Sequence, residues 1–148
     1  MKNCLLLLLA FTIFSSCGKD ELSVAEQFDL DTKLIEEYLK ANNKTALKTP
    51  EGIFYIIEKE GTAEKPKLTS TVSCSYNGYF LDKVSFDSSS KASFPLYSVI
   101  QGWQIGIPKF GKGGKGTLLI PSVYGYGTKE TAGRASAVLI FDIEVFSF

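Results

Sequence analysis

The chain contains no histidine among its 148 residues. Imidazole is the commonest general base, the usual partner of a serine or cysteine nucleophile, and the commonest transition-metal ligand. The 16 basic and 16 acidic residues balance, and no run of lysine or arginine marks a nucleic-acid-binding surface. We therefore expect no metal, no cofactor and no nucleic acid, and any chemistry must proceed without a histidine.

Cysteine is also scarce, with three in the chain: Cys4, Cys17 and Cys74. The first two lie in the N-terminal segment, which leaves Cys74 as a single thiol in the body and excludes a disulfide framework there. The apolar Val72 and Cys74 alternate with the polar Ser73, as on a half-buried strand. Because no histidine or obvious cation is available to activate it, a structural thiol is favoured over a nucleophile.

The one long apolar run, Leu5 to Phe14, is shorter than the roughly 20 residues needed to span a membrane. It follows Lys2 and precedes small residues, which is the layout of an export signal. The segment FSSC, ending at Cys17, resembles the lipobox of bacterial lipoproteins. That resemblance implies removal of residues 1–16, lipidation of Cys17 and attachment to the cell envelope, with the outer membrane expected. The alternative is a secreted protein cut nearby that keeps a free Cys17.

The next segments predict a tether and a helix. Residues 17–30 are polar and acidic, as in a linker. Residues 31–48 are expected to form an amphipathic helical extension, with Asp31 as its cap and an apolar stripe that docks on the domain or on a second copy. The stripe contains Leu34, Ile35, Tyr38 and Leu39.

The remaining residues, 49–148, read mostly as strands and form the expected domain. Strands without a helix between each pair indicate an antiparallel sheet. We predict an α+β fold in which about five strands wrap over one short helix, VIQGWQIGIPKF. The expected strand segments are 53–59, 71–80, 85–88, a stretch near Phe94, 116–121 and 137–148.

Five short motifs follow one another in this domain, and together they resemble the FKBP-type peptidyl-prolyl isomerases from about Gly52 to Phe146. Any one of them alone would be a weak signal, whereas five in order are specific. They are YNG at 76–78, FDSS at 86–89, VIQGW at 99–103, YGYG at 124–127 and FDIE at 141–144.

The resemblance implies an apolar pocket for a proline ring, with Trp103 as its floor. It assigns catalytic roles to Tyr76, Asp87, Ile100 and Tyr126 and substrate-binding roles to Phe86, Phe94, Val99, Trp103 and Phe141. Without the motif order, such aromatic residues would be interpreted as core filling. The implied activity is cis–trans isomerisation of X–Pro bonds in exported polypeptides, which needs neither nucleophile nor proton shuttle and therefore suits a chain without histidine.

Three departures from the family pattern modify this expectation. The segment between Ser89 and Phe94 is short, and Lys91 is the nearest substitute for an arginine that often pairs with the pocket aspartate. The loop after Gly127 is short and polar, which predicts a shallower, wetter pocket, reduced activity and weaker binding of macrolide inhibitors. Lys83 stands where a hairpin turn usually has glycine. The alternative function is a lipoprotein that binds proline-containing or unfolded segments without turnover, as a chaperone.

Overall fold

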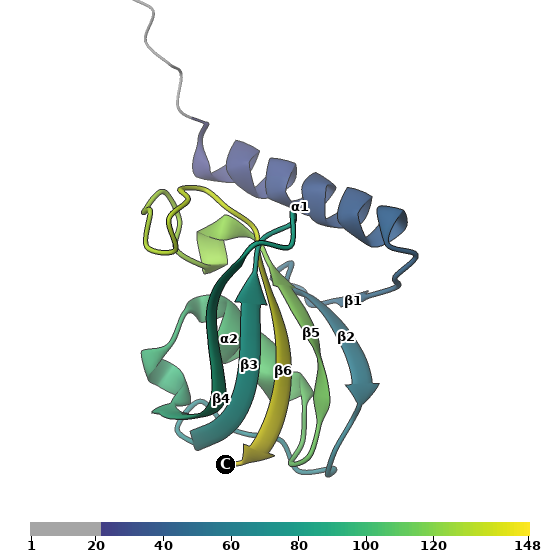
Figure 1. Ribbon diagram of the computed structural model, residues 1–148, viewed down its shortest axis with the longest axis vertical. Helices are drawn as coiled ribbons and strands as arrows, with labels where there is room; N and C mark the ends of the chain where they lie inside the picture. Colours follow the sequence, from purple (N-terminus) through teal and green to yellow (C-terminus); the bar gives the residue numbers. More distant parts are fainter. Residues whose placement is uncertain (1–21) are drawn as a thin grey trace, which may run out of the picture.

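The computed structural model describes residues 22–148. The expected signal peptide and the expected lipidation site, Cys17, lie outside the described residues. The described part consists of one twisted sheet, a long helix α1 across one end of it, and a short helix α2 against one face (Figure 1). No helix in residues 22–148 has the length and apolar character needed to cross a membrane.

The sheet has six antiparallel strands in the order β1-β2-β5-β6-β3-β4, so the α+β class is confirmed and the expected strand number was one too low. The two segments expected near Ser85 and Phe94 are one long strand. The additional edge strand β1 lies inside the segment expected to be helical. The strands are β1 (Leu47–Lys48), β2 (Phe54–Lys59), β3 (Thr71–Tyr79), β4 (Ser85–Pro95), β5 (Lys115–Ile120) and β6 (Leu139–Ser147).

Helix α2 (Gln101–Gly106) packs closely on strand β5 because two of its residues have no side chain. A Cβ atom at Gly102 would collide with Ile120, and one at Gly106 would lie 2.7 Å from the Leu118 Cδ1 atom. Glycine weakens a helix but allows this approach. Three short 3₁₀ turns complete the connections: η1 (Leu96–Ser98), η2 (Ile107–Lys109) and η3 (Ser122–Tyr124).

Helix α1 (Val24–Ala41) begins well before the expected cap at Asp31, so the expected linker is partly helical. Its true cap is Ser23, whose side chain accepts from the Glu26 backbone N–H while the Glu26 carboxylate accepts from the Ser23 N–H. This reciprocal capping box stabilises the first turn. Asp31 is instead buried in the middle of the helix.

The two faces of the sheet bury two different clusters, as the alternation of side chains along a strand requires. Leu118 and Ile120 of β5 point towards α2, whereas Leu119 points to the opposite face. There it meets Ile35 and Leu39 of α1. The apolar stripe of α1 therefore packs on this chain's own sheet, which is one of the two docking modes that the sequence left open.

Candidate active site

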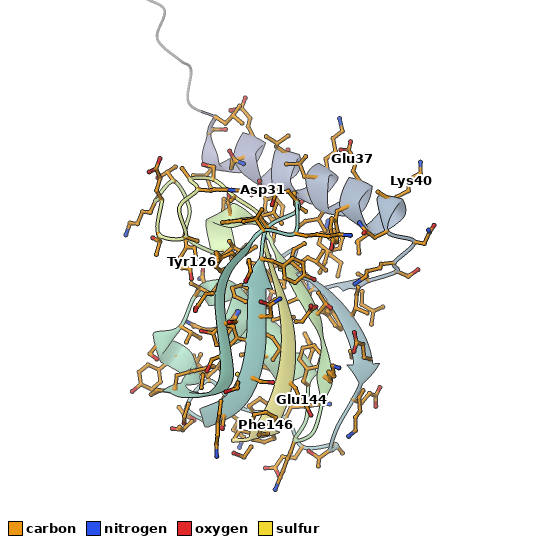
Figure 2. All side chains as sticks on the ribbon, in the orientation of Figure 1. Asp31, Glu37, Lys40, Tyr126, Glu144 and Phe146 are labelled. Atoms are coloured by element: carbon orange, nitrogen blue, oxygen red, sulfur yellow. The ribbon has the colours of Figure 1, made fainter. Side chains whose placement is uncertain are left out.

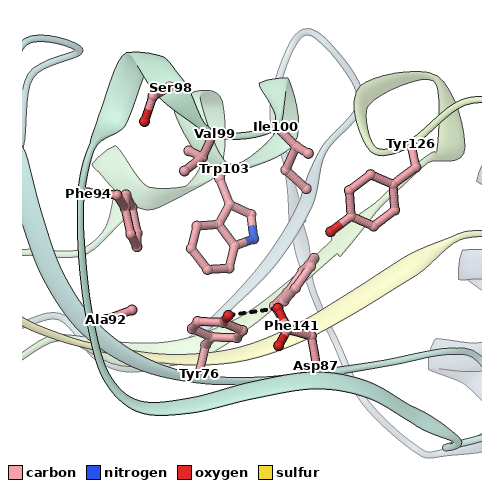
Figure 3. A pocket seen from close by; sticks show the side chains of 10 residues that line it. All are labelled: Tyr76, Asp87, Ala92, Phe94, Ser98, Val99, Ile100, Trp103, Tyr126 and Phe141. Atoms are coloured by element: carbon pink, nitrogen blue, oxygen red, sulfur yellow. Dashed lines mark hydrogen bonds between the residues drawn. The ribbon is translucent and has the colours of Figure 1, made fainter. Parts of the chain in front are cut away.

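A pocket of about 280 Å³ opens on the α2 face of the sheet, between α2, strands β3 and β4, and the segment after η3 (Figure 3). Eight of the nine residues expected in the site line it. They are joined by two residues that the sequence did not indicate. The lining residues are Tyr76, Asp87, Ala92, Phe94, Ser98, Val99, Ile100, Trp103, Tyr126 and Phe141.

Trp103 forms the floor of this pocket and is only 5% exposed. Its indole meets the rings of Tyr76 and Phe141 edge to face, with ring centroids 5.0 Å apart in both pairs. The Phe94 ring lies 5.2 Å from it on another side. These are favourable aromatic geometries. The indole is therefore held rigidly by rings from three different strands and presents a fixed apolar surface to the pocket.

A charged group lies at the edge of this apolar surface. The Tyr76 hydroxyl donates a 2.7 Å hydrogen bond to the Asp87 carboxylate, which is exposed at the pocket rim. Burial, assisted by that hydrogen bond and the negative charge of Asp87, raises the pKa of Tyr76 to about 12. Tyr76 thus stays protonated at neutral pH and orients one carboxylate oxygen.

The rim above the indole is fixed by the start of α2. The Ile100 carbonyl accepts hydrogen bonds from the backbone N–H groups of Trp103 and Gln104. The Gln104 side chain reaches back and donates to the Val99 carbonyl at 2.7 Å. The N–H of Ile100 itself donates no hydrogen bond to any other described residue. Because Ile100 lines the pocket, its N–H is a candidate backbone donor for a bound molecule.

Tyr126 closes the opposite side, and its hydroxyl points into the pocket (Figure 3). Within residues 22–148 this hydroxyl makes no hydrogen bond, although Asp87 is close enough to affect its titration. Burial, followed by the charge of Asp87, raises the pKa of Tyr126. Tyr126 is accordingly a second donor available to a bound molecule.

Phe86 was expected to bind substrate, but it lies behind the pocket wall and does not line it. Its ring packs edge to face on Phe141 at 5.5 Å and against Phe80 at 4.8 Å. Gly78 makes room for this stack, because a Cβ atom there would lie 2.9 Å from the Phe86 ring. Phe86 is placed to support Phe141.

The two lining residues that sequence reasoning missed are Ala92 and Ser98. Both are small, and neither stands in one of the five motifs. Ala92 could have been found from its strand phase, since it lies two residues before Phe94 and therefore on the same face of β4. Ser98 precedes the VIQGW motif and carries no signal of its own.

Asp87 forms no ion pair with any basic side chain in the described part of the chain. Lys91, the residue suggested for this role, forms no ion pair there. The short loop after Gly127 is instead tied to the β3–β4 hairpin by Arg134, which contacts Asp82 at 2.8 Å and lies over the Phe80 ring at 4.3 Å. The hairpin itself turns at Lys83 with a φ of 68°, the left-handed conformation that favours glycine.

Residues 22–148 contain no group of three or more potential metal ligands. Cys74 is buried, and burial raises the pKa of its thiol to about 11, so thiolate chemistry is disfavoured. What the pocket offers is a rigid aromatic floor, two hydrogen-bond donors and an oriented carboxylate. Such a site can bind and hold a small apolar ring with its flanking amides.

Comparison with known proteins agrees with this geometry. Residues 62–146 match the family described as FKBP-type peptidyl-prolyl cis-trans isomerase. FkpA of Aeromonas hydrophila, named as an isomerase of this type, is 42% identical over 120 residues, which cover 76% of this chain and 44% of that protein. The chain thus spans less than half the length of this relative.

Two crystal structures have the same fold. FkpA from Escherichia coli superposes with a TM-score of 0.72 at 31% identity, covering 80% of this chain and 59% of that one. A peptidyl-prolyl cis-trans isomerase from Pseudomonas syringae superposes with a TM-score of 0.72 at 25% identity, covering 86% and 96% of the two chains. The chain belongs to the FKBP-type peptidyl-prolyl cis-trans isomerase family.

Proposed function

We propose that this protein catalyses cis–trans isomerisation of X–Pro bonds in polypeptides and that the pocket around Trp103 is its active site. The observation that carries the proposal is the rigid aromatic floor of one cavity that Ile100 and Tyr126 also line, each with a donor that has no hydrogen-bond partner within residues 22–148. Family membership supports the same reaction.

The barrier to this reaction comes from amide resonance and amounts to ~18–20 kcal/mol. When the bond is twisted by a quarter turn, the resonance is lost and the carbonyl becomes less dipolar than in the planar amide. An apolar pocket therefore solvates the twisted form relatively better than water does, and a site that binds the transition state more tightly than the ground state is a catalyst. A thousandfold acceleration requires a difference of about 4 kcal/mol.

The polar groups position the peptide around the proline ring. The Ile100 N–H and the Tyr126 hydroxyl each donate to a substrate carbonyl, which fixes the chain on both sides of the rotating bond. Asp87, oriented by Tyr76 at 2.7 Å, faces the polar edge of the twisted amide. Phe94, Val99 and the other apolar walls exclude water from the ring.

We expect the isomerase activity to be lower than that of an enzyme whose pocket is deep and covered by a loop. Asp87 is exposed, and the loop after Gly127 is held towards the β3–β4 hairpin by Arg134. Water that reaches the bound amide stabilises the planar, dipolar ground state and so weakens the discrimination. For the same reason we expect macrolide inhibitors to bind weakly.

The proposed location is the cell envelope, where the protein assists folding of exported proteins from a lipid anchor at Cys17. The apolar run before the FSSC segment supports export and lipidation. Replacement of Cys17 by serine is expected to move the protein from the membrane fraction to the soluble fraction and to remove the lipid mass from the intact protein. If the mass of the wild-type protein shows no added lipid, lipidation of Cys17 is contradicted.

The enzymatic proposal is tested with a short fluorogenic peptide that has an apolar residue before proline. The wild-type protein is expected to accelerate cis-to-trans conversion, while Tyr126→Phe and Asp87→Asn lower kcat/KM by roughly tenfold each, the effect of about 1.4 kcal/mol. Matched controls are Tyr55→Phe on β2 and Asp29→Asn, exposed on α1, which should leave the rate unchanged. Equal losses in the controls would contradict the assignment.

The same preparations distinguish catalysis from binding alone. If the folded wild-type protein binds an unfolded client but leaves the uncatalysed exchange rate unchanged, the protein is a binding module with an FKBP fold. If Tyr126→Phe lowers turnover and leaves client binding unchanged, the pocket is an isomerase site and client binding uses another surface.

A further inference from the structure

A buried carboxylate connects helix α1 to the segment that carries Tyr126. Asp31 is fully buried and faces the domain, whereas Glu37 and Lys40 of the same helix point outward (Figure 2). One oxygen of the Asp31 carboxylate accepts two hydrogen bonds from Ser122, from its backbone N–H at 2.7 Å and its hydroxyl at 2.6 Å. The other oxygen accepts from the Gln27 amide at 2.7 Å.

Ser122, which donates these hydrogen bonds to Asp31, also forms hydrogen bonds with both neighbours of Tyr126. Its carbonyl accepts hydrogen bonds from the N–H groups of Gly125 at 2.9 Å and Gly127 at 2.8 Å. Tyr126 lies between these two glycines. The position of its side chain in the pocket is therefore set by the turn that Ser122 closes, and Ser122 is set by Asp31.

An aromatic contact adds to these hydrogen bonds at the junction. The Phe28 ring of α1 meets the Tyr124 ring edge to face at 6.2 Å. Next to it, a groove of about 510 Å³ separates the first turn of α1 from residues 127–136. Since this side of the loop is not packed against the helix, the hydrogen bonds between Asp31 and Ser122 act with the aromatic contact to place the turn.

The chemistry of the contact suits that task. A buried carboxylate is unfavourable unless it is hydrogen-bonded, and Asp31 has no ion-pair partner in the described part of the chain. Hydrogen bonds to an ionised carboxylate are short and strong, so three of them fix the side chain in one orientation. An aspartate that only capped a helix, or that lay in a solvated linker, would not need three hydrogen bonds from protein groups.

We infer that Asp31 is a positioning residue for Tyr126 and that helix α1 is a functional part of the isomerase site. This inference rests on the proposed function, since Tyr126 is the group through which Asp31 acts on turnover. The helix then does more than connect the domain to the envelope, because its buried carboxylate determines where the pocket presents a donor.

The test is a double-mutant cycle on the full chain. Asp31→Ala is expected to lower kcat/KM by up to roughly tenfold, the loss expected from Tyr126→Phe itself, because it misplaces that catalytic group. In a Tyr126→Phe background the same change should lower it by no more than about twofold, because coupled residues are not additive. Asp31→Asn, whose amide oxygen can still accept from Ser122, should retain most activity, and Asp29→Ala on the exposed side of α1 should retain all of it.

A readout independent of turnover uses fluorotyrosine labelling and ¹⁹F NMR. The Tyr126 resonance is identified by its loss in Tyr126→Phe. It should shift or broaden in Asp31→Ala, while the Tyr55 resonance on β2 stays in place. If Asp31→Ala does not fold, Ser122→Ala, which removes only the hydroxyl bond, should move the same resonance by a smaller amount.

Two results would overturn the inference: equal rate losses in the wild-type and Tyr126→Phe backgrounds, or an unmoved Tyr126 resonance in a folded variant. Absence of any acceleration by the wild-type protein would instead contradict the proposed function. In that case the NMR result alone decides whether Asp31 positions Tyr126.

Discussion

The two faces of the sheet use the same strands for different purposes. Towards α2 the residues that surround Trp103 are mostly aromatic, and their rings meet edge to face around a hollow. Towards α1 the buried cluster is mainly aliphatic, including Ile35 and Leu119, and contains no such set of rings around one side chain. The side-chain period of two assigns alternate residues of one strand to the two environments.

The difference teaches how a pocket arises in a packed protein. Around Trp103 the aromatic rings meet edge to face and line a hollow of about 280 Å³. The helices differ accordingly: α2 is short and approaches β5 through glycines, whereas α1 is long and packs through Ile35 and Leu39. Asp31 links α1 through two hydrogen bonds to Ser122, in the turn that carries Tyr126.

The largest effect is expected from Trp103→Ala, because this side chain is both core and pocket floor. Removing it should lower the free energy of unfolding by ~3–5 kcal/mol and abolish turnover, as measured by denaturant unfolding and the peptide assay. Trp103→Leu keeps more volume and should recover stability without recovering turnover. Full activity in a folded Trp103→Leu variant would show that the indole floor is not required.

Ile35→Ala tests the other face. The side chain is fully buried under α1, so its truncation should lower the free energy of unfolding by about 3 kcal/mol. Turnover per folded molecule should stay within twofold, because the Asp31–Ser122 contact is retained. Leu30→Ala, on the exposed side of the same helix, is the control and should change stability by less than about 0.5 kcal/mol.

A smaller effect is expected from pH. Tyr76 has a folded-state pKa of about 12 against an ordinary value of 10. The neutral form is favoured by folding, so its contribution to stability is complete below pH 10 and is lost as the pH rises through about 12. Denaturant unfolding across this range should show a steeper loss of stability for the wild-type protein than for Tyr76→Phe. Equal slopes would contradict the role assigned to the Tyr76–Asp87 pair.

The smallest effect is expected from Arg134→Ala. Both charges of the Arg134–Asp82 pair are about half exposed, and such pairs contribute no more than about 1 kcal/mol. The local consequence should be clearer than the global one: backbone amides of residues 128–136 should exchange faster with solvent. Lys129→Ala on the same loop, which lacks that contact, is the matched control.

The pocket could largely be predicted from the sequence because its residues stand in five short motifs. Motif order specified Trp103 as the floor. Phe86 was assigned to the pocket through the family resemblance. Its ring is on the α2 side of the sheet, as expected, but packs behind Phe141 and does not reach the cavity.

The N-terminal helix was harder to predict. Ser23 and Glu26 form a recognisable capping box, but the surrounding polar residues resembled a linker and hid it. An aspartate before an apolar stripe usually caps a helix, so nothing local distinguishes the buried Asp31. Its partner, Ser122, is 91 residues away in the chain, and only the fold brings the two together.

The most direct test of the central claim is exchange NMR on a short X–Pro peptide in the presence of catalytic amounts of the protein. The account predicts cis–trans exchange far faster than the uncatalysed process, which takes tens to hundreds of seconds, and a return to that slow rate with folded Trp103→Leu. Uncatalysed exchange in the presence of the folded wild-type protein would contradict the assignment of this pocket as an isomerase site.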